Sequence, residues 1–338
     1  MTTIQDVIRH LEAIAPPAYQ EDYDNAGLIT GDPADEVHGA LTCLDATEQV
    51  IREAVRRGCN LIVAHHPIVF KGLKKLTGTT YVERVVIEAI RQKIAIYAIH
   101  TNLDNMYLDG VNGEIAARLG LIHTRILMPR PEWQTARLTL PSSLEPTLRV
   151  QLLSYDAGEL LHILPAGENT IVCELRFDRA RQNALRQLLQ ALAPESLDAA
   201  VWQTATNPHP GIGAGLIGEL PEPLPGAQFL QLVKSSMHAS CVRHTALPEK
   251  SVKKVALCGG SGSFLLAPAM AQGADAYVSA DFKYHEFFDA DGKILIADIG
   301  HYESEQFTVQ LLQKIISRKF TNFAAYCTEA STNPVYYL

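Results

Sequence analysis

Leu61-Ile62-Val63-Ala64-His65-His66-Pro67 is the stretch of this chain that decides its fold. The short apolar run follows Gly58 and is typical of a buried parallel strand. Consecutive strand residues point to opposite faces, so both imidazoles can serve one site only if the chain leaves strand geometry there. The restriction that Pro67 places on His66 favours such a departure. Ligands of open α/β sheets bind beyond the carboxyl ends of strands, so we expect a metal or ligand site at this pair.

Strands and helices alternate around this stretch. The hydrophobic pattern predicts strands over residues 40–44, 60–64 and 93–99, and helices over residues 47–57 and 81–91. This spacing indicates βαβ units, an α/β fold class and a largely parallel sheet.

The second half of the chain repeats this pattern. Residues 273–281 can be laid on residues 58–66, because each segment has a glycine, a short strand and a polar end. Residues 293–296 parallel residues 93–96, and each of these strands is followed by a histidine with a carboxylate four residues later. The pairs are His100 with Asp104 and His301 with Glu305. Four residues are about one helical turn, so each pair lies on one face if its segment is helical. We therefore expect duplicated βαβ units with one shared site.

A segment of different composition separates the two halves. Residues 128–206 are rich in proline, leucine and alanine, with strand-like runs at 137–140 and 170–177 and an amphipathic helix over 179–192. A chain of 338 residues also exceeds what one hydrophobic core usually supports. We expect a small inserted α+β domain at 128–206, within a discontinuous domain made of 1–127 and 207–338.

The overall composition excludes several classes of protein. Lysine and arginine total 29 against 37 aspartates and glutamates, and the net charge of −8 argues against a general nucleic-acid binder. Residues 1–17 lack a basic segment followed by a long apolar one, and no apolar run is long enough to span a bilayer. The six cysteines show no CxxC spacing. We expect a reduced, cytoplasmic protein with no signal peptide and no membrane partner.

The polar residues at the strand ends form a candidate metal-ligand set. The set is His65, His66, Asp104, His301 and Glu305, with His100 as a sixth ligand or a hydrogen-bond partner of one. Imidazole and carboxylate without thiolate suit Zn, Mn, Fe, Co or Ni. Five ligands are too many for one tetrahedral site and fit two divalent ions, with Glu305 positioned to bridge them. Such a pair, about 3.5 to 4 Å apart, ionises water near neutral pH and favours hydrolysis of an anionic substrate.

Three further segments have both a functional and an ordinary interpretation. Asp281, His285 and Glu286 could transfer protons at the rim of the site, or could simply begin a solvated polar helix. The basic loop Lys71-Gly72-Leu73-Lys74-Lys75 could face an anionic ligand or be solvated. Gly259-Gly260-Ser261-Gly262-Ser263 follows a predicted strand and could bind phosphate through its backbone, although it has no P-loop lysine and no complete dinucleotide fingerprint.

Several of these motifs together resemble a known family. The motifs are Tyr23-Asp24-Asn25-Ala26-Gly27-Leu28, Ala64-His65-His66-Pro67, His100-Thr101-Asn102-Leu103-Asp104, Asp281 to His285 and Gly300-His301-Tyr302-Glu303-Ser304-Glu305. They resemble the GTP cyclohydrolase I type 2 homologues, also described as proteins similar to the NGG-interacting factor. The resemblance covers roughly residues 1–127 and 207–338. It implies a dinuclear metal site at the five candidate ligands, with His100 close by.

The resemblance also implies an assembly and an activity. Longer members carry an inserted domain that resembles the PII or CutA fold, at the place of residues 128–206. Members look like toroidal homohexamers with the metal sites facing an inner cavity. The family name implies hydrolytic opening of the GTP imidazole ring, with a metal-bound hydroxide attacking C8. Two alternatives stay open, because no residue here recognises guanine: a dinuclear phosphoesterase, and a non-enzymatic metal-handling or regulatory protein.

Overall fold

The computed structural model describes residues 1–130, 133–204 and 209–338. The chain forms two compact units, of which the larger combines Met1–Met128 with Gly213–Leu338 and the smaller is Pro129–Ile212. The smaller unit thus begins one residue after the predicted start of the insert. The predicted end of the insert, between residues 206 and 207, lies outside the described residues.

The first sheet of the larger unit contains the strand that ends in the two histidines. Gly58 ends the preceding helix in a left-handed conformation, with φ 68°, and the chain then enters that strand. Four neighbouring strands of this sheet are parallel, and only the edge strand β1 is antiparallel to its neighbour. The order is β1 (Gly27–Thr30), β4 (Ala95–Ala98), β3 (Leu61–His66), β2 (Gly39–Asp45) and β15 (Ala324–Cys327).

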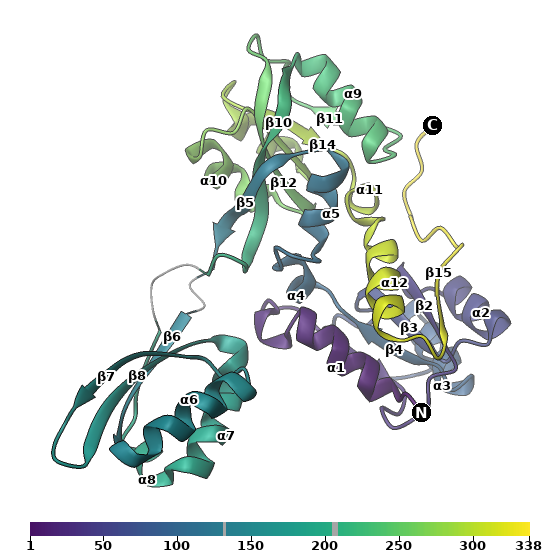
Figure 1. Ribbon diagram of the computed structural model, residues 1–338. Coiled ribbons are helices and arrows are strands. Elements are labelled where there is room, and N and C mark those ends of the chain that lie inside the picture. Colours follow the sequence, from purple (N-terminus) through teal and green to yellow (C-terminus); the bar gives the residue numbers. More distant parts are fainter. Residues whose placement is uncertain (131–132, 205–208) are drawn as a thin grey trace. The chain divides into compact units, whose positions relative to one another are not determined.

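Helices cover both faces of this sheet. Leu61 and Val63 of β3 belong to the core beneath α1 (Ile4–Ile14) and α12 (Thr308–Lys319). Ile62 and Ala64 instead belong to the core formed with α2 (Glu48–Arg57) and α3 (Tyr81–Arg91). Figure 1 shows α12 beside β2 and β15, with α2 beyond the sheet. Burial on both faces explains why β3 is an unbroken apolar run rather than an alternating one.

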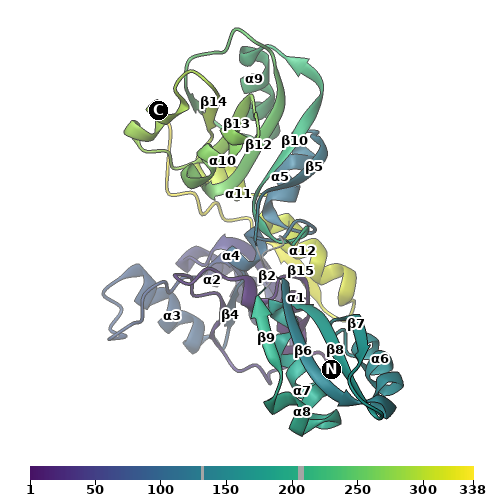
Figure 2. The ribbon, with the colours of Figure 1, turned by 90° about the vertical axis from the view of Figure 1, so that its left-hand side faces the viewer.

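The second sheet repeats the first. Strands β12, β13 and β14 are parallel like β2, β3 and β4, and β11 flanks β14 antiparallel as β1 flanks β4. Figure 2 shows β14, β13, β12, β10 and β5 in this order. The sheet is β11 (Arg243–His244), β14 (Leu295–Asp298), β13 (Ala276–Ala280), β12 (Val252–Ser261), β10 (Gly213–Leu224) and β5 (Ile122–Pro129). The predicted duplication and the α/β fold class are confirmed.

Short helices follow the strands of both sheets. In the second half, α9 (Gly226–Ser236) and α10 (Leu266–Ala271) pack on opposite faces of the sheet, and α5 (Val111–Arg118) joins the core shared with the first sheet. The two predicted one-turn helices are α4 (Thr101–Asp104), after β4, and α11 (His301–Glu305), after β14. The segment Tyr284–Ala290 forms a 3-10 helix, η5. None of the helices in the described part of the chain is both long and apolar enough to cross a membrane.

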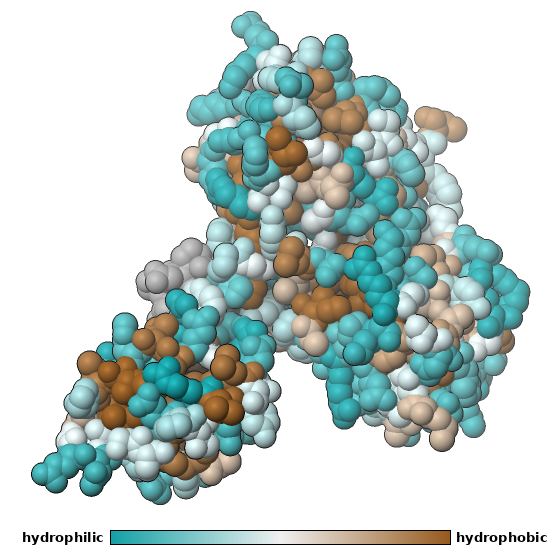
Figure 3. Space-filling view, in the orientation of Figure 1, coloured by the Kyte–Doolittle hydropathy of each residue, from teal (hydrophilic) through white to brown (hydrophobic). Residues whose placement is uncertain are grey.

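The smaller unit is an antiparallel sheet with helices packed on it. The four strands run in the order β7 (Glu159–Pro165), β8 (Thr170–Asp178), β6 (Trp133–Pro141) and β9 (Val201–Thr204). Its separate core joins Leu138 and Leu175 of the sheet to Leu148 and Leu185 of the helices α6 (Glu145–Ser154) and α7 (Gln182–Leu192), which α8 (Pro194–Asp198) follows. Figure 3 shows apolar as well as polar surface on this unit.

Candidate metal centre

The ends of β3, β4 and β14 bring the five predicted ligand side chains into one cluster. His65 and His66 end β3, Asp104 ends α4, and α11 begins at His301 and ends at Glu305. The rings of His65 and His66 are adjacent in the sequence and also in space, with centroids 4.9 Å apart. Both imidazoles therefore reach one site. The expected departure from strand geometry is wrong, because β3 stays paired with β2 as far as His66.

Glu305 lies between two groups of these side chains. Its Oε2 is 2.9 Å from His66 Nε2 and 3.1 Å from His301 Nε2. Its Oε1 is 3.9 Å from His65 Nε2, which in turn is 3.5 Å from Asp104 Oδ1. The potential ligand atoms of each group lie within 4.8 Å of one another, so each group could hold a metal ion.

His100 lies beside the same cluster. Its ring is 5.3 Å from that of His65 and 5.2 Å from that of His66, and the three histidines form a further group that could hold a metal ion. The two predicted roles for His100, ligand or neighbour, therefore both fit its position.

The Nδ1 atom of every clustered histidine already has an oxygen partner. His65 Nδ1 is 2.9 Å from the carbonyl oxygen of Ile99, which can only accept, so this ring carries its proton on Nδ1. The other three partners are carboxylates: Asp45 for His66 at 2.9 Å, Asp24 for His100 at 2.8 Å and Asp281 for His301 at 2.7 Å. Such partners hold a metal-binding ring in place and leave Nε2 as the ligand atom.

Two buried atoms of the cluster make no hydrogen bond within the described residues. They are His65 Nε2 and Asp104 Oδ1, which face each other across 3.5 Å. A buried polar group without a partner costs about 1 to 3 kcal/mol, so such groups are uncommon. A metal ion bound by both atoms would remove this cost, so the donor set fits a metal.

The charges of the cluster also fit a cation. Burial lowers the pKa of His66, but hydrogen bonds to Asp45 and Glu305 outweigh it and raise that pKa to about 10. His301 is affected in the same way, and its pKa rises to about 11. Burial lowers the pKa of His65 to about 3, so this imidazole stays neutral and ready to coordinate. His66 and His301 thus each hold a proton next to the Glu305 carboxylate, and a metal ion could take the place of these protons.

Glycines allow β12 to pass close to Glu305. Gly260 has φ +62° in a stretch where the pairing of β12 with β13 shifts register, and a Cβ there would overlap Glu305 Oε1. The amide of Gly259 donates to Asn112 at 2.9 Å, and that of Gly260 donates to Ser304 at 2.9 Å. The predicted phosphate-binding role of this segment is therefore not what the structure favours, because these two amides are occupied.

Of the three residues predicted to transfer protons, Asp281 contacts a predicted metal ligand, whereas His285 and Glu286 make local contacts in and beside η5. Asp281 is hydrogen-bonded to His301, so it holds that ring. The exposed side chain of His285 contacts Tyr284 and Phe288 in η5, and none of its ring contacts in the described chain reaches the cluster. Glu286 accepts a hydrogen bond from the amide of Lys283, which is the ordinary role of a residue at a helix start.

Some partners of the cluster were missed by sequence reasoning. Asp24 is part of a motif that carries the family resemblance, but its contact with the cluster was not predicted: it fixes His100 and also accepts from the amide of Thr101 at 3.1 Å. Asp45 ends β2, next to β3, and its other oxygen accepts from the Thr332 hydroxyl at 3.0 Å. The carboxyl-end rule that drew attention to His65 would also have found Asp45. Thr332 carried no signal, since it lies in an irregular segment.

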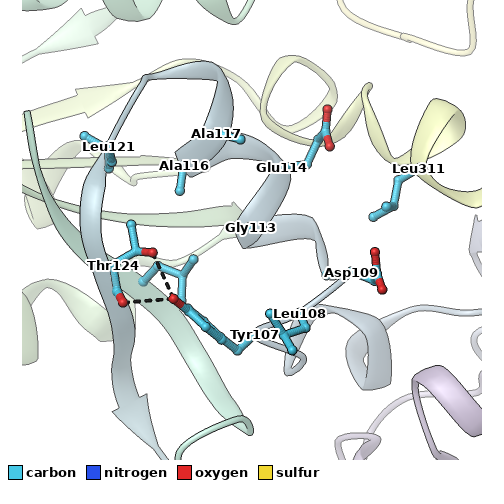
Figure 4. A pocket seen from close by; sticks show the side chains of 12 residues that line it. Tyr107, Leu108, Asp109, Gly113, Glu114, Ala116, Ala117, Leu121, Thr124 and Leu311 are labelled. Carbon is cyan, nitrogen blue, oxygen red and sulfur yellow. Dashed lines mark hydrogen bonds between the residues drawn. The ribbon is translucent and has the colours of Figure 1, made fainter.

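A cavity of about 320 Å³ lies elsewhere in the larger unit. Figure 4 shows it beside α5, where the Tyr107 hydroxyl donates to the carbonyl oxygen of Thr124 at 2.9 Å. Asp109, Glu114 and Leu311 also line it. It shares no lining residue with the histidine cluster.

Comparison with known proteins identifies the family. Residues 2–334 match the model of Duf34/NIF3 (NGG1p interacting factor 3). The chain belongs to this family. Similar proteins of Bacillus subtilis and Staphylococcus epidermidis are both called GTP cyclohydrolase 1 type 2 homolog. The former is 28% identical over 99% of this chain and 98% of its own length, the latter 27% identical over 99% of each.

Solved structures of the family have the same fold. A Bacillus cereus protein related to NIF3 aligns with a TM-score of 0.82 at 28% identity, covering 100% of this chain and 99% of its own. A Staphylococcus aureus protein aligns with a TM-score of 0.83 at 27% identity, with the same coverage. The family that the motifs predicted is therefore confirmed across nearly the whole chain.

Proposed function

We propose that this protein is a metal-dependent hydrolase with a dinuclear centre, acting on an anionic, nucleotide-like substrate. The observation that carries the proposal is the position of Glu305, which turns one oxygen toward His66 and His301 and the other toward His65 and Asp104. A carboxylate between two metal-binding groups is the arrangement that two-metal hydrolases use. The relatives called GTP cyclohydrolase 1 type 2 homolog support the nucleotide-like class of substrate.

The residues of this chain would perform three tasks in such an enzyme. The clustered imidazoles and carboxylates would hold two ions of Zn, Mn, Fe, Co or Ni. When bound, such ions supply an ionised water and stabilise developing negative charge. Asp24, Asp45 and Asp281 orient three of the rings through Nδ1. Because Asp281 is tied to His301, we assign it first to orientation, and a proton-transfer role for Asp281 or His285 stays a prediction.

A metal-handling or regulatory protein is the second candidate. The observation that favours it is the cluster itself, whose groups of side chains could hold metal ions whether or not a substrate binds. A site that only stores or senses metal needs no adjoining substrate cavity. A dinuclear phosphoesterase would use the same ligands and differ only in the substrate that it accepts.

Metal content and turnover, measured on one sample, separate these functions. We expect about two metal ions per chain by elemental analysis, and metal-dependent turnover in a panel of GTP and nucleotide phosphoesters. Glu305→Gln should lose both metal and turnover, while Glu249→Gln, which removes an exposed carboxylate, should keep both. Two ions without turnover on any substrate would favour metal handling, and turnover of phosphoesters alone would identify a phosphoesterase.

The family resemblance also leads us to propose a homohexamer. Light scattering of the purified protein tests this directly. A mass near six times 37.1 kDa would support the assembly, and a mass near one chain would contradict it.

A further inference from the structure

The loop between β3 and α3 runs from the histidine cluster to the exposed surface of the larger unit. It begins directly after His66 and consists of eight consecutive exposed residues, 70–77. Phe70 is 51% exposed, and its ring nevertheless makes a T-shaped contact with the His100 ring, with centroids 5.7 Å apart and planes at 85°. The loop therefore places an open aromatic surface beside the metal groups.

Both ends of this loop are held in place. The Asn25 side chain donates to the carbonyl oxygen of Val69 at 2.6 Å, just before Phe70. At the other end, the Glu83 carboxylate accepts from the amides of Thr77 and Thr79 at 2.8 and 3.1 Å. Within the described part of the chain, the side chains of residues 70–76 make no hydrogen bond that would fix them, so they remain available to a ligand.

Three lysines lie between the anchors. Lys71, Lys74 and Lys75 form no ion pair or hydrogen bond with any of the described residues, and all three are exposed. The chain as a whole carries a net charge of −8, so three unpaired cations within five residues are a local exception. Unpaired ammonium groups on a flexible stem bind phosphate groups as point charges.

We propose that residues 70–76 form a binding element for a ligand that combines a planar ring with several phosphate groups. The ring stacks on Phe70 above His100, and the three lysines bind the phosphates. This inference rests on the proposed function, because it supplies the substrate recognition that the metal cluster lacks. Stacking tolerates different bases, since every base has a π-face, so the element selects the class of ligand rather than guanine.

The test measures the affinities of GTP and of inorganic triphosphate by titration calorimetry. The first variant combines Lys71→Ala, Lys74→Ala and Lys75→Ala, and its control combines Lys234→Ala, Lys314→Ala and Lys319→Ala. The control removes the same charge from exposed lysines of the helices α9 and α12. We expect the loop variant to bind both ligands about ten-fold more weakly than the control, since three weak charge contacts are lost. Equal affinities in the two variants, or no binding of either ligand by the unaltered protein, would overturn the proposal.

A second variant separates the ring from the phosphates. Phe70→Ala should weaken GTP binding about ten-fold, the usual effect of removing a stacking ring. It should leave triphosphate binding unchanged, and Phe70→Tyr should restore the affinity for GTP. Equal loss for both ligands in Phe70→Ala would overturn the stacking contact.

Metal content of each sample, measured before and after titration, keeps this test independent of the proposed function. If the unaltered protein holds no metal, the proposal of a metal-dependent hydrolase is wrong, but the dependence of triphosphate binding on the loop lysines is still measured. If metal is retained and the loop variants behave like the control, the inference about the loop fails alone.

Discussion

Gly260→Ala is the substitution that tests the geometry around Glu305 most sharply. The backbone at Gly260 is left-handed, and a Cβ there would overlap Glu305 Oε1. An L-residue in this conformation costs about 1 to 2 kcal/mol. Glu305 is 3% exposed and bonded to two histidines, so moving its carboxylate also weakens charge-assisted hydrogen bonds of about 1.5 to 3 kcal/mol each. We expect a total destabilisation of about 3 to 5 kcal/mol.

Gly273→Ala is the matched control. Gly273 is also left-handed, with φ +72°, but a Cβ there meets nothing within 4 Å. It should therefore cost only the backbone strain, about 1 to 2 kcal/mol, and leave metal binding unchanged. A unit of this size loses about 2 to 4 °C in Tm per kcal/mol, so we expect losses of about 10 °C for Gly260→Ala and about 4 °C for Gly273→Ala.

Thermal unfolding of metal-free protein and a metal titration of each variant provide the assay. Gly260→Ala should also bind metal about 100-fold more weakly, which is the upper end of the loss when an outer partner of a ligand is removed. If both variants lose the same stability and bind metal equally well, the close approach of β12 to Glu305 is irrelevant to the site, and the reasoning is refuted.

Four further predictions follow from the hydrogen bonds and charges of the larger unit. Thr332→Val removes the hydroxyl that donates to Asp45, so it should lower metal affinity about 10-fold, whereas Thr332→Ser should keep the affinity of the unaltered protein. An unchanged affinity in Thr332→Val would show that the C-terminal segment has no part in orienting His66. His66 and His301 have pKa values of about 10 and 11, so a metal ion that binds both rings at neutral pH displaces two protons. The logarithm of the metal-binding constant should therefore rise by about two per pH unit between pH 7 and 9. A metal affinity that does not change with pH would contradict this. In metal-free protein the same two raised pKa values add to the free energy of unfolding. This contribution is complete below pH 6.5, the approximate pKa of histidine in the unfolded chain, and is lost as the pH rises toward 10, which urea unfolding at several pH values would show. Glu53→Gln should lower the free energy of unfolding by about 2 kcal/mol, because the 3% exposed carboxylate accepts from Arg57 and from the backbone of the C-terminal segment; no change in urea midpoint would contradict it.

Most of the fold could be predicted because both halves use the same local rules. Leu61 to Ala64 form an unbroken apolar run, since β3 is covered on both faces, and the His-x-x-x-carboxylate spacing at His301 fixed one helical turn after β14. The antiparallel flanking strands β1 and β11 were not predicted. β11 is only two residues long, too short for any alternating pattern to reveal it.

The site was predicted in its ligands but not in their supports. Ligands at strand ends follow from local sequence and topology together. Asp24 and Thr332 reach the cluster only through tertiary folding of irregular segments, and no spacing along the chain indicates such contacts. The glycine segment suggested phosphate binding because glycine loops often bind phosphate. The structure shows another reason for Gly260, since a side chain at this position would overlap the Glu305 carboxylate.

Anomalous X-ray scattering from crystals of the metal-loaded protein is the most direct test of the dinuclear centre. We expect two peaks about 3.5 to 4 Å apart, one beside Glu305 Oε2 with His66 and His301, the other beside Oε1 with His65 and Asp104. A single peak in this cluster, or metal bound elsewhere in the chain, would contradict it.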